Sequence, residues 1–184
     1  YGFVDLNGKL RVANRYEGIG LYNNGMANIK ILNKWGTINK EEEIVVQPYY
    51  DQIGLFKDKL AIAQKNNRYG ILNDSGKVVI AFDYDSIFRL HNRNYICVLN
   101  SKYGLINNQG ELMFYPKYDS ILDLDNGFVI AERKKLSGVF SSSGVFIIPV
   151  KYDQIIFDPY KELFLVTEDP EWEQIMNLKD VIPY

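Results

Sequence analysis

The segment Gly-Ile-Leu-Asn-Asp-Ser-Gly-Lys-Val-Val-Ile, residues 70–80, places two short apolar runs on either side of an Asn-Asp-Ser-Gly turn. Residues that favour β-strands, flanking a cluster of Asn, Asp and Gly, are typical of a β-hairpin. Residues 104–114, Gly-Leu-Ile-Asn-Asn-Gln-Gly-Glu-Leu-Met-Phe, repeat this pattern 34 positions later. The two segments therefore predict the same hairpin in two places.

The same spacing of 34 residues runs through the whole chain. A glycine, a tyrosine, an acid directly after the tyrosine and an isoleucine two residues beyond the acid each recur five times, without insertion or deletion. The four columns are Gly2, Gly36, Gly70, Gly104 and Gly138; Tyr16, Tyr50, Tyr84, Tyr118 and Tyr152; Glu17, Asp51, Asp85, Asp119 and Asp153; and Ile19, Ile53, Ile87, Ile121 and Ile155. Such a period is the sequence signature of a repeat architecture.

The repeats predict a single repeat domain that covers residues 1–184. Its expected segments are 1–33, 34–67, 68–101, 102–135 and 136–170, followed by a partial capping repeat at 171–184. The partial repeat has lost the glycine, and we expect it to cover the open face of the fifth repeat. Trp172 should then take the place that Trp35 and Tyr69 hold in full repeats. The apolar residues expected to pack against the fifth repeat are Ile175, Met176, Val181 and Ile182.

The content of the repeat predicts an all-β fold. No window keeps a helical period of 3.6 residues, and we expect three to four strands in each repeat. Tandem β-meander repeats form either an open, solenoid-like array or a closed β-propeller. A propeller blade usually has about 40–50 residues, and five repeats plus part of a sixth is not the integral count that a ring needs. The open array is therefore favoured, with the propeller as the alternative.

Composition excludes several classes of protein. The 184 residues carry 23 acids against 21 bases, and 47% of them are hydrophobic. An acidic pI near 5.5 argues against a nucleic-acid-binding platform. A single cysteine, Cys97, can form neither an intramolecular disulfide nor a thiolate metal site. No apolar run reaches the roughly 18 residues of a membrane-spanning helix. Because the chain starts at Tyr1 without a Met, we expect a fragment or processed form, with the cell envelope or secretion favoured.

Three segments of the second repeat resemble a known family. They are Lys-Trp-Gly-Thr-Ile-Asn-Lys at 34–40, Ile-Val-Val-Gln-Pro-Tyr-Tyr-Asp at 44–51 and Lys-Leu-Ala-Ile-Ala at 59–63. These residues resemble the WG repeat, also called the KWG repeat, a β-rich module of bacterial proteins. The resemblance covers essentially the whole chain, although Ser137 replaces the aromatic residue in the fifth repeat. It implies a binding or scaffolding repeat and brings no catalytic residues with it.

The loops that follow the isoleucine column are candidates for partner contact. Their sequences differ in every repeat, and variable loops on one face of a solenoid commonly meet the partner. The alternative is a solvated loop that varies without selection. The candidate contact residues are Tyr22, Asn24, Phe56, Asp58, His91, Asp125 and Tyr160.

Two columns carry aromatic residues and admit two interpretations. Trp35, Tyr69 and Tyr103 precede a glycine, and they are candidates for stacking on a glycan. The simpler interpretation is packing, because every repeat meets the same neighbour. In the same way, the acids after the tyrosines should accept backbone N–H bonds at turns, and the tyrosines should pack between repeats. Packing also predicts that Ile87 is buried.

The sequence therefore predicts a non-enzymatic scaffold module that binds another protein. The alternative is a module that binds a cell-surface or cell-wall glycan. An enzyme is the least supported class, because His91 stands alone without a nucleophile or an orienting partner. No cofactor, metal, nucleic acid or membrane span is expected.

Overall fold

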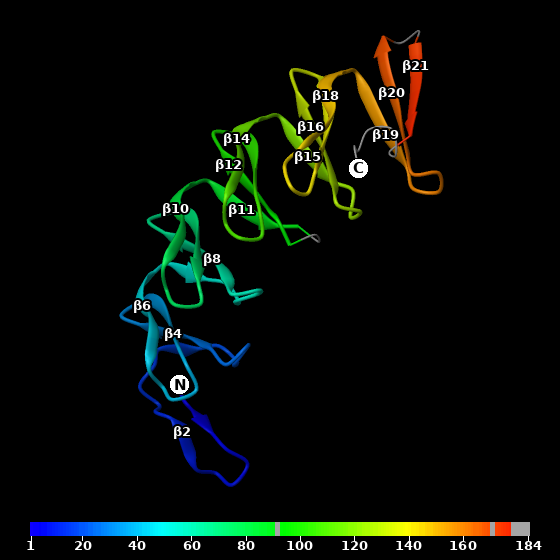
Figure 1. Ribbon diagram of the computed structural model, residues 1–184. Coiled ribbons are helices and arrows are strands. Elements are labelled where there is room, and N and C mark those ends of the chain that lie inside the picture. The colour runs from blue at the N-terminus through cyan, green and yellow to red at the C-terminus, as the bar shows by residue number, and fades with distance from the viewer. Residues whose placement is uncertain (91–92, 170–171, 178–184) are drawn as a thin grey trace. The chain divides into compact units, whose positions relative to one another are not determined.

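The computed structural model describes residues 1–90, 93–169 and 172–177; of residues 168–169 and 172–177 only the backbone is described. Every regular element in this part of the chain is a β-strand, as the sequence predicts (Figure 1). In chain order the strands are β1 (Phe3–Val4), β2 (Leu10–Val12), β3 (Gly18–Ile19), β4 (Ala27–Ile31), β5 (Lys34–Ile38), β6 (Ile44–Tyr50), β7 (Gln52–Ile53), β8 (Leu60–Lys65), β9 (Arg68–Asn73), β10 (Val78–Tyr84), β11 (Ser86–Arg89), β12 (Tyr95–Leu99), β13 (Lys102–Ile106), β14 (Leu112–Tyr118), β15 (Ser120–Asp123), β16 (Phe128–Arg133), β17 (Leu136–Ser141), β18 (Phe146–Tyr152), β19 (Gln154–Asp158), β20 (Leu163–Asp169) and β21 (Trp172–Asn177).

The strands form six antiparallel sheets in which each strand pairs with the next along the chain. The first sheet is β1-β2, the second β3-β4-β5-β6 and the third β7-β8-β9-β10. The fourth is β11-β12-β13-β14, the fifth β15-β16-β17-β18 and the sixth β19-β20-β21. Short turns make this meander possible, because antiparallel neighbours need only a two-residue connection. The sheet is the unit that repeats.

The four-stranded sheets are out of phase with the expected sequence segments. They span residues 18–50, 52–84, 86–118 and 120–152, so each begins two residues after a tyrosine of the column. The expected segment 34–67 instead begins at β5, the third strand of the second sheet. A repeat period determines the spacing of equivalent residues. The pairing of the strands decides at which residue each structural repeat begins.

The chain divides into two compact units, Tyr1–Ile87 and Phe88–Tyr184. The boundary falls inside β11. Strand pairing is that of a tandem array. Among the described residues, β1 and β2 pair only with each other and β21 pairs only with β20. No sheet is therefore completed by strands from both ends of the chain, as the alternative of a ring closed in that way would require.

A glycine of the column sits where two strands approach each other closely. A Cβ atom on Gly36 would lie 2.5 Å from the carbonyl oxygen of Val46 and 2.9 Å from the nitrogen of Pro48. The register of β5 and β6 shifts at this point, which indicates a β-bulge. Close backbone approach therefore explains why this position is glycine.

In each of the first five sheets, the turn between the last two strands is stabilised by a short polar side chain. In the third sheet, Oδ1 of Asn73 accepts hydrogen bonds from the backbone N–H groups of Ser75, at 3.1 Å, and Lys77, at 2.9 Å. Gly76 supplies the left-handed residue of the turn, with φ of +80°. The equivalent acceptors are Asp5, Asn39 and Asn107, with Ser141 bonding through its hydroxyl. Because these bonds are local, the hairpins can be predicted from the sequence.

The tyrosine column packs between consecutive sheets. Tyr50, at the end of β6, is buried in one cluster with Ile53, Phe56 and Leu72 of the third sheet. In the second unit Tyr118 is buried in a cluster drawn from the fourth and fifth sheets. The packing interpretation of this column is confirmed, and identity in every repeat follows because each tyrosine meets the same neighbour.

The isoleucine column is mostly buried. Ile87 has 5% of its surface exposed, which confirms the prediction that it is buried. Ile53 and Ile155 are also buried, whereas Ile19 and Ile121 are half-buried. Burial of the column therefore differs from repeat to repeat, and three of its five isoleucines are buried.

The sixth sheet differs from the sequence prediction in its register. Gln174 lies opposite Val166 in β20, the place where Trp35 lies opposite Lys30 in the second sheet. Trp172 lies opposite Asp169, so the prediction that Trp172 replaces Trp35 is wrong. The reason is that β20 continues to Asp169, two residues beyond the place equivalent to Arg133 at the end of β16, which displaces the residues of β21.

The remaining residues of the expected cap are only partly described. The backbones of Ile175 and Met176 pair with Leu165 and Phe164, which places them on the last sheet. Val181 and Ile182 lie outside the described residues. The backbone of β21 thus adds a third strand beside β20.

Candidate functional site

Acids of the column hold two-residue turns in the left-handed conformation, as Glu17, Asp51 and Asp119 show. The carboxylate of Glu17 accepts hydrogen bonds from the N–H groups of Leu32 and Asn33, both at 2.9 Å. That of Asp119 accepts one from the N–H of Lys134 at 2.6 Å. The turns, with φ from 47° to 66°, are Leu32–Asn33, Asn66–Asn67, Asn100–Ser101 and Lys134–Lys135. The acids therefore have a structural role in fixing type I′ turns.

A cation at the start of the third strand pairs with the acid of the column. The pairs are Lys34–Asp51, Arg68–Asp85 and Lys102–Asp119. Hydrogen bonds from the lysine ammonium groups hold the pKa values of Asp51 and Asp119 below the usual range. In the fifth sheet the equivalent position is Leu136, which cannot pair with Asp153. The repeated charge pattern is thus interrupted in the second unit.

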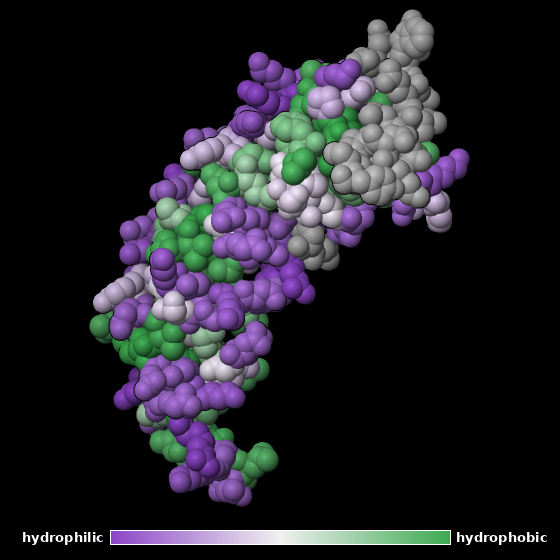
Figure 2. Space-filling view, viewed as in Figure 1, coloured by the Kyte–Doolittle hydropathy of each residue, from purple (hydrophilic) through white to green (hydrophobic). Residues whose placement is uncertain are grey.

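One apolar column that sequence reasoning missed is exposed. It occupies the start of the last strand in each hairpin and comprises Leu10, Ile44, Val78, Leu112 and Phe146. Leu10, Ile44 and Val78 in the first unit and Phe146 in the second keep 43–54% of their surface exposed. Figure 2 shows apolar side chains among polar ones at the surface of both units. The 34-residue spacing is visible in the sequence, but residue type alone does not tell an exposed apolar column from a buried one.

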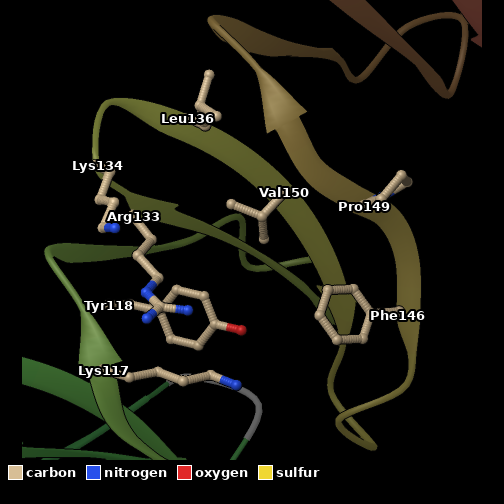
Figure 3. Close-up of a pocket in the computed structure, with 8 residues that line it drawn as sticks. All are labelled: Lys117, Tyr118, Arg133, Lys134, Leu136, Phe146, Pro149 and Val150. Carbon is tan, nitrogen blue, oxygen red and sulfur yellow. The ribbon is translucent and has the colours of Figure 1, made fainter.

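In the second unit, Phe146 borders a cleft between the end of β14, the β16–β17 turn and the edge strand β18. The cleft has a volume of about 450 Å³. Figure 3 shows Tyr118 between Lys117 and Arg133, with Phe146 and Val150 facing it from β18. The lining residues are Lys117, Tyr118, Arg133, Lys134, Leu136, Phe146, Pro149 and Val150.

Two of the lining residues, Tyr118 and Phe146, belong to a cluster of four aromatic rings. Phe140 is buried at its centre, with its ring centroid 4.2 Å from that of Phe146, 4.8 Å from Phe114 and 5.5 Å from Tyr118. Phe114 and Tyr118 meet edge to face at 5.0 Å. Because buried rings pack at interior density in fixed rotamers, they hold Phe146 in place. The exposed ring of Phe146 therefore rests on a rigid support.

The rim of the cleft is basic. Among the described residues, Lys117, Arg133 and Lys134 have no carboxylate within ion-pair distance of their cationic groups. The Nζ atom of Lys117 lies 5.3 Å from the ring centroid of Tyr118, a cation–π contact. Asp119, whose pKa is also lowered by the charge of Arg133, is already held by Lys102. Three cations thus surround an apolar floor in a chain whose net charge is -2.

A sequence profile described as the WG containing repeat matches the chain at residues 1–35, 35–69, 69–101 and 103–135. The chain belongs to the WG-repeat family. The resemblance that the Lys-Trp-Gly and Pro-Tyr-Tyr-Asp segments indicate is thereby confirmed. No curated protein matches the chain significantly.

Solved structures with a similar arrangement share little sequence with this WG-repeat chain. The crystal structure of a eukaryotic initiation factor is 10% identical, with a TM-score of 0.45, over 90% of this chain and 52% of its own. The extracellular domain of the putative one component system BT4673 from B. thetaiotaomicron is 12% identical, with a TM-score of 0.39, over 97% of this chain and 30% of its own. The WG-repeat chain thus spans about half or less of the length of these structures.

The aromatic residues of the WG motif lie across from the tyrosine column. Trp35 is opposite Tyr50 on neighbouring strands, and its half-buried ring packs against the cluster around that tyrosine. Lys30 lies over the indole, with Nζ 5.9 Å from the ring centroid. Tyr69 and Tyr103 are also half-buried, opposite Tyr84 and Tyr118. These rings have packing partners, and only part of each is accessible to a glycan.

Two of the candidate loop residues belong to the core of their repeats. Phe56 is buried in the cluster of the third sheet. Tyr22 is half-buried against Phe3, with ring centroids 5.5 Å apart, and its hydroxyl donates to the carbonyl of Asn39 at 3.0 Å. Asn24 is exposed, and its amide donates to the carbonyl of Phe56 at 3.1 Å, which joins consecutive loops.

The other candidate loop residues are exposed where the structure describes them. Asp58 and Asp125 lie at left-handed turn positions, with φ of 49° and 59°. Tyr160 is 97% exposed, and its backbone N–H donates to Oδ1 of Asp158 at 2.9 Å. His91 lies outside the described residues. The structure thus separates the predicted loop row into packing residues and surface residues.

The described part of the chain offers little for catalysis or metal binding. It holds no group of three or more His, Cys, Asp or Glu side chains arranged to bind a metal. Burial raises the pKa of the Cys97 thiol to about 12, and Cys97 is fully buried as a small apolar residue. No described segment is a helix of the length and apolarity needed to cross a membrane.

Proposed function

We propose that this WG-repeat chain is a non-enzymatic module that binds another protein. The observation that carries the proposal is the apolar column in which Leu10, Ile44, Val78 and Phe146 are exposed and Leu112 is half-buried. Packing accounts for a buried column that is constant in type, because each repeat meets the same neighbour. It does not account for a column in which four of the five side chains keep about half of their surface in water. Exposed apolar groups on a regular scaffold are typical of protein contact surfaces.

The variable loops would supply specificity to such a module. Asp58, Asp125 and Tyr160 are exposed. Asp58 and Tyr160 occupy equivalent positions of the loop and differ in type, and Asp125 is at the adjoining position. Tyrosine is enriched at protein interfaces, whereas charged residues at the rim steer association and exclude wrong partners. In this proposal the repeated column provides the common contact and the loops select the partner.

The test is affinity capture with two matched double variants of the full chain. Ile44→Ser/Val78→Ser alters the column within the first unit, and Leu21→Ser/Leu55→Ser alters two exposed leucines of the same unit that are outside the column. Any protein captured by the wild type and the control should be lost from the column variant. With the purified partner, the column variant should bind about tenfold more weakly, since interface residues commonly contribute 1 kcal/mol or more each.

Three results would contradict the proposal. The first is that no protein binds the wild type in preference to the column variant. The second is that both variants lose a partner equally, which would show an unspecific response to lost apolar surface. The third is saturable binding of a cell-wall or host glycan that quenches the fluorescence of Trp35, which would favour the glycan-binding function in its place.

A further inference from the structure

We propose that the cleft between β14 and β18 binds an acidic peptide segment of the partner protein, with a carboxylate at the basic rim and an apolar side chain on Phe146. The inference deepens the proposed function, on which it rests, by giving the chemistry of the bound segment. All of the lining residues belong to the second unit.

Charge is the first argument. Lys117, Arg133 and Lys134 form the rim without a described carboxylate in ion-pair contact. At the positions equivalent to Lys117, Arg133 and Lys134, no other repeat has more than one cation; the single cations are Arg15, Lys65 and Lys151. The combination of three cations is therefore particular to this cleft, although single basic residues recur at these positions. A cluster of like charges in an acidic chain is complementary to an anionic group on a ligand.

The apolar floor is the second argument, because it excludes a bare anion as the fitting ligand. Phe146 is 54% exposed, and its ring is supported by Phe140 at 4.2 Å. Val150 lies on the same side of the cleft (Figure 3). A free phosphate or sulfate would contact the cations and leave this surface in water. A ligand that covers both parts must join a negative charge to an apolar group.

The form of the cleft is the third argument, and it favours a peptide over a small molecule. Small-molecule sites commonly enclose most of their ligand, whereas this cleft of about 450 Å³ lies at the surface, with Lys117, Arg133 and Phe146 all exposed. Arginine, tyrosine and phenylalanine together at a rigid spot are typical of the residues that dominate protein interfaces. Pro149, which lacks an N–H donor, disfavours addition of a further strand to β18, so side chains should carry recognition.

The experiment measures fluorescence anisotropy of labelled hexapeptides titrated with the full chain. The test peptide is Ser-Glu-Glu-Leu-Phe-Gly. Its three comparison peptides are Ser-Gln-Gln-Leu-Phe-Gly, without charge, Ser-Glu-Glu-Ser-Ser-Gly, without apolar side chains, and Ser-Lys-Lys-Leu-Phe-Gly, with reversed charge. The test peptide should bind most tightly, and its affinity should fall as salt rises from about 50 mM to about 300 mM, because exposed charge pairs are screened.

Matched variants locate the binding. Arg133→Gln and Lys117→Gln should each weaken binding of the test peptide about two- to fivefold, the range for an exposed ion pair. Lys65→Gln changes the residue equivalent to Arg133 in the third sheet and should leave the affinity unchanged. Phe146→Ser should weaken binding about fivefold or more through lost apolar contact, whereas Val78→Ser, at the equivalent place in the first unit, should not. Equal melting midpoints would confirm that the folded state is intact.

Several outcomes would overturn the inference. One is the absence of saturable binding of the test peptide, and another is equal binding of the peptide without apolar side chains. Displacement of the test peptide by inorganic phosphate, with Phe146→Ser unchanged, would show a simple anion site. If Arg133→Gln leaves both the peptide and a captured partner bound while Ile44→Ser/Val78→Ser loses the partner, the proposed function stands and this inference fails.

Discussion

The carboxylate of Glu42, in the hairpin turn of the second sheet, accepts a hydrogen bond of 3.1 Å from the hydroxyl of Tyr16 in the preceding repeat. The same Oε1 atom accepts the backbone N–H of Ala13 at 3.2 Å and lies 3.1 Å from the guanidinium of Arg15. Glu42 stands in a column that is otherwise glycine, with φ of +64°. A strained backbone conformation is therefore retained at a position whose side chain joins two repeats.

Substitution of Glu42 should separate these two effects. Glu42→Ala keeps the left-handed strain and loses the three contacts, and it should destabilise the chain by about 1–2 kcal/mol. Glu42→Gly loses the same contacts but relieves the strain, so it should be more stable than Glu42→Ala by about 1 kcal/mol. Urea unfolding of both variants checks the order. A glycine variant no more stable than the alanine variant would contradict the strain argument.

Gly36→Ala should be poorly tolerated. The added Cβ would lie 2.5 Å from the carbonyl oxygen of Val46, and backbone atoms on both strands would have to move. We expect a loss of about 1–3 kcal/mol, as for overpacking elsewhere. Gly20→Ala is the control, because the nearest atom to its Cβ outside the adjoining residues would be 3.7 Å away. Thermal unfolding should show a lower midpoint for Gly36→Ala alone, and equal midpoints would refute the close-approach explanation.

Ile87→Ala should remove a buried side chain and cost about 2–5 kcal/mol, the usual range for such a cavity. Ile19→Ala, at the same place in the repeat but half-buried, should cost less. The two variants can be compared by urea denaturation followed by circular dichroism. A smaller effect at Ile87 than at Ile19 would show that burial does not govern this column.

Acid should weaken the turns that Asp51 and Asp119 hold. Their folded-state pKa values lie below the usual aspartate value of 3.8, chiefly because Lys34 and Lys102 donate hydrogen bonds to them. The stabilisation is present above pH 3.8 and is lost as the pH falls through the lower folded-state pKa, where the carboxylates become protonated. In Asp51→Asn this acid-dependent loss should be smaller, which melting midpoints across the acid range can measure. A pH profile identical to that of the wild type would contradict it.

Local features were predictable because they depend on neighbouring residues. The side chain of Asn73 bonds to a backbone N–H four residues away, and Gly76 supplies the left-handed residue of the turn. The hairpin can therefore be predicted without the rest of the chain. The acid at Asp119 and the turn at Lys134 are more distant, yet the 34-residue period indicated that such acids act at turns. The candidate loop row was only partly informative, since Phe56 is a core residue and Asp58 is a surface residue.

The sequence by itself determined the period, the all-β content and the WG-repeat family, since these follow from local turn chemistry and from residue identity at fixed spacing. Only the tertiary structure decided which apolar columns are buried. Phe56 and Phe146 are both apolar residues at recurrent positions, but one is covered by neighbouring strands and the other is not. The register of Trp172 and the basic cleft at Arg133 were likewise decided by strand pairing and by residues brought together from different strands. Burial and clefts depend on residues that are distant in the sequence. A repeat period gives the spacing of equivalent residues along the chain, but it does not identify the residues that each of them contacts on neighbouring strands.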